Sequence, residues 1–462
     1  MKAKEKDKKE ANAKLFSLVK VSSLKKGFVT AILVIAVLAM FTAAAVAGAD
    51  DPPCTCGDIC VNETGWWRAG GDFNASSTPI QHAIDNATEG NTSCGQDGTY
   101  TENVEVYKSL TIRSTSGNPA DTIVQAANPD PVFAVTTDYV NISGFTMTKS
   151  VDDGIYLNDV NHCNISSNNV LSNGAGIHLD SSNNNIITGN NVNNSVMPGN
   201  GIALKDSSNN ILTNNTVSNN SGYGILLESG NNNLTLTNNT IFDNLYSFGV
   251  YGSSLFHYIQ NIDTSNTVNG RPIYYGVNQQ NRQIPNDAGF VGVVNSTNIT
   301  VRDLTLTKNG EGVLFAYTNN SKIENVNASS NDDGILLVSS SNNTLANNTA
   351  SYNENGIFLY SSSNNMLMNS TASNNFYGIY LQSSSNYNTL TNNTANSNNE
   401  AGIFLYTSCN YNTLTNNTAN SNDEGIVLLD SGGNNLTSNT MSGNSYNFGV
   451  YADSLFHYIQ NI

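Results

Sequence analysis

The sequence has 462 residues, with 19 basic and 36 acidic side chains and a formal net charge of −17. Nine of the basic residues precede Gly27, so the rest of the chain holds 10 basic against 33 acidic residues. This charge disfavours nucleic acid and anionic lipid as partners. It suits an exported protein that stays soluble through an acidic, polar surface.

The first 49 residues have the pattern of an export signal. Residues 1–26 are Lys-rich, residues 28–48 carry no charge, and small residues surround Ala47 and Ala49. This order predicts a secretory signal that is removed after one of the two alanines. An uncleaved anchor is the alternative, because an apolar stretch of this length also spans a bilayer. In both cases the N-terminal helix engages the membrane or the export machinery, and residues 50 onward lie outside, at the cell surface or beyond it.

Residues 50–77 are predicted to form a cysteine-rich extracellular linker. Cys54, Cys56 and Cys60 lie in it, and Cys94 follows. Outside the cell, two disulfides are expected, and Cys54 and Cys56 are too close in sequence to bridge easily, so each reaches Cys60 or Cys94. A soft-metal site for Zn or Cu(I) is the alternative, although the spacing is not a standard zinc pattern. Two further cysteines in distant coils are expected to be lone core or turn residues rather than a bonded pair, Cys163 and Cys409.

Residues 78–153 are predicted to hold a capping helix and the first coils of a repeat. Thr78-Pro-Ile-Gln81 predicts a short helix through Ala87, with Thr78 as N-cap and Gln81 completing a capping box. Alternating strand patterns begin near Val104. We expect the helix to plug the open end of the first coil, because a solenoid needs a terminal cap.

A Gly-Ile-x-Leu signature dominates residues 154–462. Successive copies lie 22 to 25 residues apart, apart from one interval of 63 residues. The signature glycines are Gly154, Gly176, Gly201, Gly224, Gly334, Gly356, Gly378, Gly402 and Gly425, and looser versions lie at Gly249, Gly312 and Gly449. A fixed period of this length indicates a solenoid.

The repeat predicts strands rather than helices. Ile and Leu alternate with a free position, and a second alternating run such as Asn388-Thr-Leu390-Thr follows about ten residues later. Ser and Asn clusters between the runs favour tight turns, because Asn tolerates left-handed backbone. The content of Asn, Ser and Thr opposes helix. The sequence therefore predicts an all-β, single-stranded parallel β-helix in which equivalent Asn side chains stack as ladders.

Two features depart from the simple repeat. The interval between Gly249 and Gly312 contains strand-like runs that predict about three further coils, with a polar excursion loop at about 278–288. The segment Phe248–Ile262 recurs almost unchanged as Phe448–Ile462. The second copy ends with the sequence, so we expect either a truncated tandem array or a C-terminal end that contacts another β-helix.

Together, these motifs resemble the NosD-like family. The helix, the Gly-Thr-Tyr-x-Glu-Asn-Val run after it, and the Gly-Ile-x-Leu and Asn-Asn-x-Leu-Thr-Asn-Asn coils carry the resemblance over about residues 78–462. It implies a right-handed β-helix of the type found in carbohydrate-binding proteins and sugar hydrolases, in an Asn-rich form like that of archaeal cell-surface proteins. The family is associated with periplasmic copper binding, yet the repeats contain no Cys, Met or His constellation that matches such a site.

Acidic residues provide the candidates for catalysis. The pairs Asp152-Asp153, Asp332-Asp333 and Asp423-Glu424 each precede a repeat glycine and could act as acid and base or bind Ca²⁺. They lie in separate coils, where other copies have Asn or Tyr, which favours tolerated turn variants. Five further polar residues fall on outward positions of three neighbouring coils: His178, Asp180, Lys205, Asp206 and Glu228. They form either an enzyme-like cluster or a plain solvated face.

Aromatic residues provide a stronger signal on the outward side of the repeat strand. Three adjacent coils place Phe358 and Tyr360, Tyr380 and Gln382, and Phe404 and Tyr406 on one face. Such a face suits sugar rings, although stacked aromatics also stabilise neighbouring coils. We therefore expect a non-enzymatic structural or adhesive protein that binds glycan or a surface protein, with no resident cofactor. A polysaccharide lyase or glycoside hydrolase is the first alternative and a copper-delivery protein using the four N-terminal cysteines is the second.

Overall fold

The computed structural model describes residues 54–196 and 199–451, which belong to one compact unit. The predicted export signal and most of the Phe448–Ile462 copy lie outside the described residues. The described chain is an all-β, right-handed parallel β-solenoid of about 16 turns, which confirms the predicted parallel β-helix. Within these ranges, no helix is both long and apolar enough to cross a bilayer.

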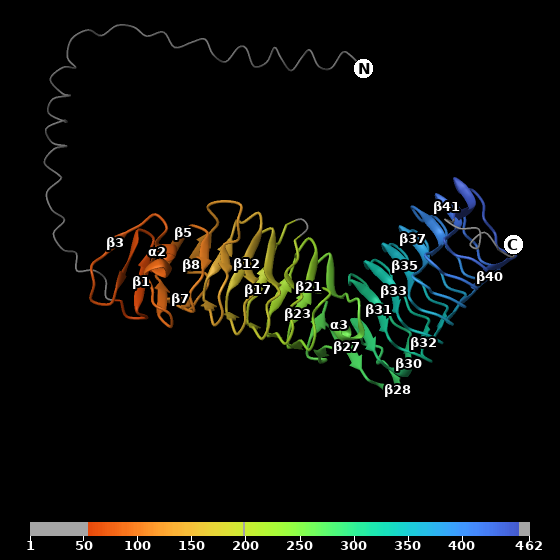
Figure 1. Cartoon of the computed structure of the whole chain (residues 1–462), viewed down its shortest axis with the longest axis horizontal. Coiled ribbons are helices and arrows are strands. Elements are labelled where there is room, and N and C mark those ends of the chain that lie inside the picture. Colours follow the sequence, from red (N-terminus) through yellow and green to blue (C-terminus); the bar gives the residue numbers. More distant parts are fainter. Residues whose placement is uncertain (1–53, 197–198, 452–462) are drawn as a thin grey trace, which may run out of the picture. The chain divides into compact units, whose positions relative to one another are not determined.

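Residues 54–268 form the first stack, in which each complete coil gives one strand to each of three sheets, whose strands pair in parallel except at the N-terminal end of the stack (Figure 1). Sheet A contains β1 (Ile59–Asn62), β2 (Gly65–Arg68), β3 (Asn74–Ala75), β4 (Thr92–Gly95), β7 (Thr111–Ser114), β10 (Asn141–Ser143), β13 (Asn164–Ser166), β16 (Ile186–Thr188), β19 (Ile211–Thr213), β22 (Thr235–Thr237) and β25 (Asn261–Ile262). Sheet B contains β5 (Gly98–Thr101), β8 (Thr122–Gln125), β11 (Thr146–Thr148), β14 (Asn169–Leu171), β17 (Asn191–Asn193), β20 (Thr216–Ser218), β23 (Thr240–Phe242) and β26 (Thr267–Val268). Sheet C contains β6 (Val104–Val106), β9 (Phe133–Val135), β12 (Asp153–Asn158), β15 (Ala175–Asp180), β18 (Ile202–Lys205), β21 (Tyr223–Leu227) and β24 (Tyr246–Val250).

The core follows from the alternation in the repeat strand. In β12 and β15, Ile155 pairs in register with Ile177 and Leu157 with Leu179, and all four side chains are buried. Buried Asn side chains stack at the corners, as the sequence predicts: Asn190 Nδ2 donates to Asn215 Oδ1 over 3.1 Å. Aliphatic side chains therefore fill the axis, and amides satisfy the buried backbone groups of the turns.

The cysteine-rich segment is a structured part of sheet A, so the predicted linker is wrong. Strand β1 pairs in parallel with β4 and antiparallel with β2. The helix α2 (Pro79–Asn86) is present where the sequence predicts one and packs on these strands. The predicted Thr78–Gln81 capping box does not form, and the Glu102 carboxylate instead accepts the backbone N–H groups of Ile80 and Gln81 over 3.0 and 2.9 Å.

The first stack ends at a chain reversal that the sequence analysis did not predict. Strand β26 pairs antiparallel with β27 (Arg271–Val277) through a two-residue turn at Asn269-Gly270. Both turn residues have positive φ, 49° and 78°, as a type I′ hairpin requires. The strand-like runs predicted in this interval are present as β27 and β29 (Phe290–Val294), which pair in parallel, but the coil is interrupted at the hairpin. Within the expected excursion loop, β28 (Gln280–Gln283) pairs with β30 (Thr297–Arg302) as the first strand of a new sheet.

Residues 271–451 form the second stack. Sheet D contains β27, β29 (Phe290–Val294), β31 (Glu311–Ala316), β33 (Asp333–Val338), β35 (Asn355–Tyr360), β37 (Tyr377–Gln382), β39 (Ala401–Tyr406), β41 (Glu424–Leu429) and β43 (Tyr446–Tyr451). Sheet E contains β28, β30 (Thr297–Arg302), β32 (Lys322–Glu324), β34 (Thr344–Ala346), β36 (Met366–Met368), β38 (Thr389–Thr391), β40 (Thr413–Thr415) and β42 (Asn435–Thr437). Single parallel bridges between threonines of successive coils, such as Thr371 and Thr394, make a third row.

The outward face of sheet D covers the open end of the first stack. Val294 and Leu314 lie on that face, yet they are buried in the same hydrophobic cluster as Phe248 and Tyr258 of the first stack. Tyr258 belongs to the short helix α3 (Leu255–Tyr258), which follows β24. The second stack thus caps the end of the first stack, so that this apolar end is not exposed to water.

Candidate functional site

The predicted aromatic face lies on the outward side of sheet D. Ile357 and Leu359 of β35 are completely buried, whereas Tyr360 is 38% exposed. The strands align in register, so one outward row contains Phe358, Tyr380 and Phe404, and the next contains Tyr360, Gln382 and Tyr406. The alternation predicted from the repeat therefore places all six residues as expected.

The first row forms a continuous ring stack. The ring centroids of Phe358 and Tyr380 are 4.8 Å apart with planes 6° apart, and those of Tyr380 and Phe404 are 5.2 Å apart with planes 7° apart. This separation matches the spacing between strands. Because the rings cover each other's faces, their edges rather than their faces point outward. This row mainly stabilises neighbouring coils.

The second row contains the exposed Tyr360 together with the half-buried Gln382 and Tyr406. The Tyr360 ring stands at 74° to Phe358, and the Tyr406 ring lies 5.6 Å from Phe404. Gln382 lies between the two tyrosines, one strand from each. Two tyrosines about 10 Å apart with an amide between them offer apolar ring surface together with a donor and an acceptor.

Sequence reasoning missed Tyr377, which it treated as part of a turn. Its ring lies 5.0 Å from Tyr380 and 5.5 Å from Phe404. Gly378 interrupts the strict alternation, and a Cβ there would lie 2.4 Å from the Gly402 carbonyl oxygen. The residue before the repeat glycine and the second residue after it therefore share a face. Aromatic residues at both positions were the available signal.

A second aromatic pair was also missed. Tyr387 and Tyr411 stack 5.3 Å apart with planes 12° apart, and both are more than half exposed. They occupy turn positions with positive φ in two successive coils. The repeated string Ser-Asn-Tyr-Asn-Thr-Leu and Cys-Asn-Tyr-Asn-Thr-Leu marked this pair in the sequence.

The predicted enzyme-like cluster is only partly assembled. His178 Nδ1 lies 3.3 Å from Asp153 Oδ2, and this contact raises the pKa of His178. His178 and Glu228 line a hollow of about 220 Å³ together with Asp152. Two other members, Asp180 and Lys205, pair with each other over 3.6 Å. The last, Asp206, packs against the turn at Gly230 instead.

Of the Asp332-Asp333 pair, Asp332 serves the contact between the two stacks. Asp332 Oδ2 accepts hydrogen bonds from the hydroxyls of Tyr223 and Tyr251. Asp333 is buried and accepts from Asn355 Nδ2 over 2.8 Å, and burial raises its pKa to about 7. The neighbouring Glu311 is completely buried, and burial raises its pKa well above the ordinary range.

The four N-terminal cysteines form two disulfides, Cys54–Cys60 and Cys56–Cys94. This agrees with the expectation that Cys54 and Cys56 bond to other partners. Cys163 and Cys409 are free, as predicted, and both are buried. In the described ranges, no three His, Cys, Asp or Glu side chains gather in a way that could hold a metal ion. The disulfide sulfurs would need reduction before they could act as thiolate ligands.

Two family models match the chain. One, described as periplasmic copper-binding protein (NosD), matches residues 265–460. The other, described as right handed beta helix region, matches residues 132–286. No curated protein matches the chain.

Solved structures with similar folds have low similarity. Pectate lyase Pel9A is 17% identical, with a TM-score of 0.38, over 64% of this chain and 78% of that one. The catalytic domain of a GH87 α-1,3-glucanase in complex with nigerose is 13% identical, with a TM-score of 0.32, over 88% and 70%. The A-module of the Azotobacter vinelandii mannuronan C-5 epimerase AlgE6 is 11% identical, with a TM-score of 0.27, over 83% and 92%. These values carry no argument about activity.

Proposed function

This chain belongs to the NosD-like right-handed β-helix repeat proteins, and we propose that it is an exported structural or adhesive protein that binds glycan through the outward face of sheet D. The carrying observation is the row of Tyr360, Gln382 and Tyr406, aligned across three strands outside the core. The two disulfides support export, because such bonds persist in oxidising compartments. The export signal itself lies outside the described residues.

The chemistry of this face favours uncharged sugars. Tyrosine rings offer apolar surface to the C–H groups of a pyranose, and Gln382 can bond hydroxyls in either direction. Carboxylates lie along one edge of this face. The pKa of Tyr377 is raised first by burial and then by the nearby charges of Glu400, Glu354 and Glu424. Because these acids repel anions, the preferred ligand is a neutral or amino-bearing glycan rather than a uronate polymer.

The test compares matched tyrosine variants on a glycan array. We expect the double variant Tyr360→Ala, Tyr406→Ala to lose binding to the glycans that the wild type retains, and Gln382→Ala to weaken it. The control is Tyr387→Ala, Tyr411→Ala, which removes two exposed tyrosines from a turn instead. Unchanged binding by the first variant would remove the glycan proposal. Phe404→Ala is a separate variant, because it also breaks the ring stack.

A polysaccharide lyase or hydrolase is the second candidate, favoured by the hollow at His178. Asp153 holds one nitrogen of the imidazole, and Glu228 lines the same hollow, so an acid and a base are both present. Incubation with polysaccharides, followed by assays for reducing ends and unsaturated uronates, tests this candidate. Product that disappears in both His178→Ala and Glu228→Gln supports it, and no product from any substrate removes it.

A further inference from the structure

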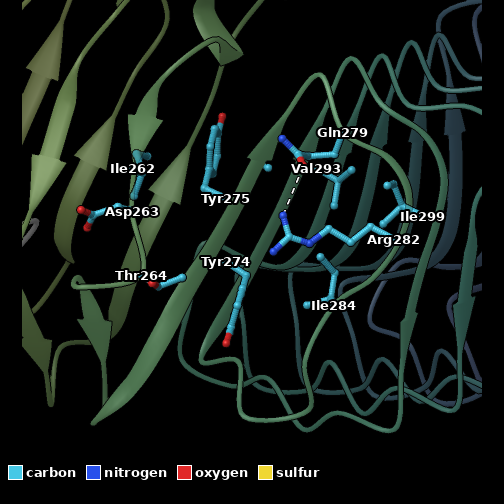
Figure 2. A pocket seen from close by; sticks show the side chains of 11 residues that line it. Ile262, Asp263, Thr264, Tyr274, Tyr275, Gln279, Arg282, Ile284, Val293 and Ile299 are labelled. Carbon is cyan, nitrogen blue, oxygen red and sulfur yellow. Dashed lines mark hydrogen bonds between the residues drawn. The ribbon is translucent and has the colours of Figure 1, made fainter.

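The second stack begins with a pocket that neither the repeat nor the aromatic face explains (Figure 2). It has a volume of about 250 Å³, larger than the roughly 150 Å³ cavity that holds benzene in an engineered protein. Its floor is the first complete layer of the core, made by the buried side chains of Ile284, Val293 and Ile299. The pocket is thus the open end of the second stack's apolar axis.

A missing side chain creates this space. Gly276 of β27 pairs in register with Val293 of β29, so the residue paired with Val293 has no side chain. A Cβ at Gly276 would meet only Gln279, 3.0 Å away at its Cγ atom. The adjacent residues Tyr274 and Tyr275 point to opposite sides in Figure 2 and form walls rather than a lid.

Arg282 occupies a position that faces the axis in the other coils. It pairs in register with Ile299, which is buried. The Ile299 backbone N–H donates to Ser321 Oγ over 2.9 Å, and the Ser321 N–H donates to Asn343 Oδ1 over 2.9 Å, so this position becomes the buried amide ladder of the later coils. A guanidinium therefore stands at the mouth of an apolar cavity.

The guanidinium has unused hydrogen-bonding capacity. Arg282 Nη1 donates to Gln279 Oε1 over 3.2 Å, drawn as a dashed line in Figure 2. Within residues 54–196 and 199–451, no carboxylate lies within 4.0 Å of it. Asp263, also at the pocket, accepts from the Ser265 N–H and turns its carboxylate away from Arg282 in Figure 2. Asp287 accepts the Tyr274 hydroxyl over 3.0 Å.

We propose that this pocket, lined by Tyr274, Val293, Ile284 and Ile299 with Arg282 at its mouth, binds a small organic anion that has an apolar body and a terminal carboxylate. The apolar part replaces the missing core layer, which removes its surface from water. The carboxylate pairs with Arg282, whose planar fork matches two carboxylate oxygens. This site is independent of the glycan face, which lies on outward residues several coils away.

The test uses 3-phenylpropionate and its neutral isostere 3-phenylpropanamide as probes, titrated by ligand-observed NMR. We expect the carboxylate to bind at least about tenfold more tightly than the amide, the difference typical of a charge-assisted contact. Arg282→Gln should remove that preference while leaving weak binding of both. The matched control is Arg302→Gln, because the guanidinium of Arg302 lies on β30 and contacts Asp303 rather than the pocket.

Gly276→Leu fills the cavity and should abolish binding of both probes while it leaves the thermal unfolding temperature unchanged or higher. Equal affinity of wild type for acid and amide, unchanged acid binding by Arg282→Gln, or no binding of either probe to the wild type would each overturn the proposal. If Gly276→Leu fails to fold, Thr264→Trp at the exposed rim is the second variant, with the same expected loss.

Discussion

The Tyr251 hydroxyl donates a hydrogen bond to Asp332 Oδ2 over 3.0 Å, which joins the last coil of the first stack to the second stack. The Tyr223 hydroxyl donates to the same oxygen and also lies 2.9 Å from the Tyr251 oxygen. Nearby, the Gly310 N–H donates to the Phe248 carbonyl over 2.8 Å. A polar network thus borders the apolar contact between the stacks.

The first prediction concerns this network. Asp332→Ala should destabilise the contact between the stacks by about 1–3 kcal/mol, because two partly buried hydroxyls lose their shared acceptor. Hydrogen exchange at residues 247–251 and 308–312 is the appropriate measurement, because stacked coils can open locally without global unfolding. The matched control is Asp423→Ala, the equivalent residue of a later coil. Equal exchange in the two variants would contradict the assigned role.

The second prediction concerns pH. Burial, with Asp333 nearby, raises the pKa of Glu311 well above its ordinary value, and Asp333 itself has a pKa raised to about 7. A carboxyl group with a higher pKa in the folded state contributes stability below its unfolded pKa of about 4, and this contribution is lost as pH rises through the folded value. We expect the unfolding temperature to fall between about pH 5 and about pH 8.

Glu311→Gln supplies the control for the pH effect. A neutral amide keeps an acceptor for the Val250 N–H, which now donates to Glu311 Oε2 over 3.2 Å. The variant should match the wild type at the lower pH and exceed its stability at the higher one. A pH slope identical to that of the wild type would show that Glu311 is not responsible.

The third prediction separates the two members of an Asn-Asn pair. Asn393 is buried, donates to the Leu367 carbonyl over 3.0 Å and accepts the Ser370 N–H over 3.0 Å, whereas Asn392 is exposed with a φ of 56°. Asn393→Ala should cost about 2–4 kcal/mol, since it leaves buried backbone groups unsatisfied. Asn392→Gly should change the free energy of unfolding by less than about 1 kcal/mol, because glycine adopts the same backbone. Denaturant unfolding of both variants, with losses of similar size, would refute the distinction.

The fourth prediction concerns the cysteines. Burial raises the pKa of the Cys163 and Cys409 thiols to about 11, so they should react slowly with a thiol reagent in the native protein. After denaturation without reductant, two thiols per chain should react, and after reduction all six. Six reactive thiols before reduction would exclude the disulfides. Copper bound only by the reduced protein would favour the copper-delivery alternative.

The sequence predicts the local geometry of the coils well, because each strand contacts only its neighbours in the stack. The Gly-Ile-x-Leu pattern correctly places Ile357 and Leu359 inside and Tyr360 outside. The amide ladders follow from the same period, since equivalent residues of successive coils meet. Residues that repeat in the sequence make the same contacts in each coil, so the period alone predicts which side chains are buried and which form ladders.

Contacts that are not repeated could not be predicted in this way. Glu102 caps α2 from 22 residues away, and Tyr251 meets Asp332 across 81 residues. Neither contact recurs in the other described coils. The reversal at Asn269-Gly270 did have a local signal, because Asn-Gly favours a type I′ hairpin. Asn-Gly also begins an ordinary repeat strand here, since Asn355-Gly356 opens β35, so the dipeptide alone did not distinguish a reversal from another coil.

The uniform register of sheet D has a consequence for how such a molecule changes over evolutionary time. Asp333, Asn355 and Tyr377 occupy equivalent positions at equal steps of 22 residues. A duplication or loss of one such step would join equivalent positions of two coils. It would lengthen or shorten sheet D by one strand and leave the hairpin at Asn269-Gly270 and the contact tyrosines Tyr223 and Tyr251 unchanged. The length of the second stack can therefore change without a change in its contact with the first stack.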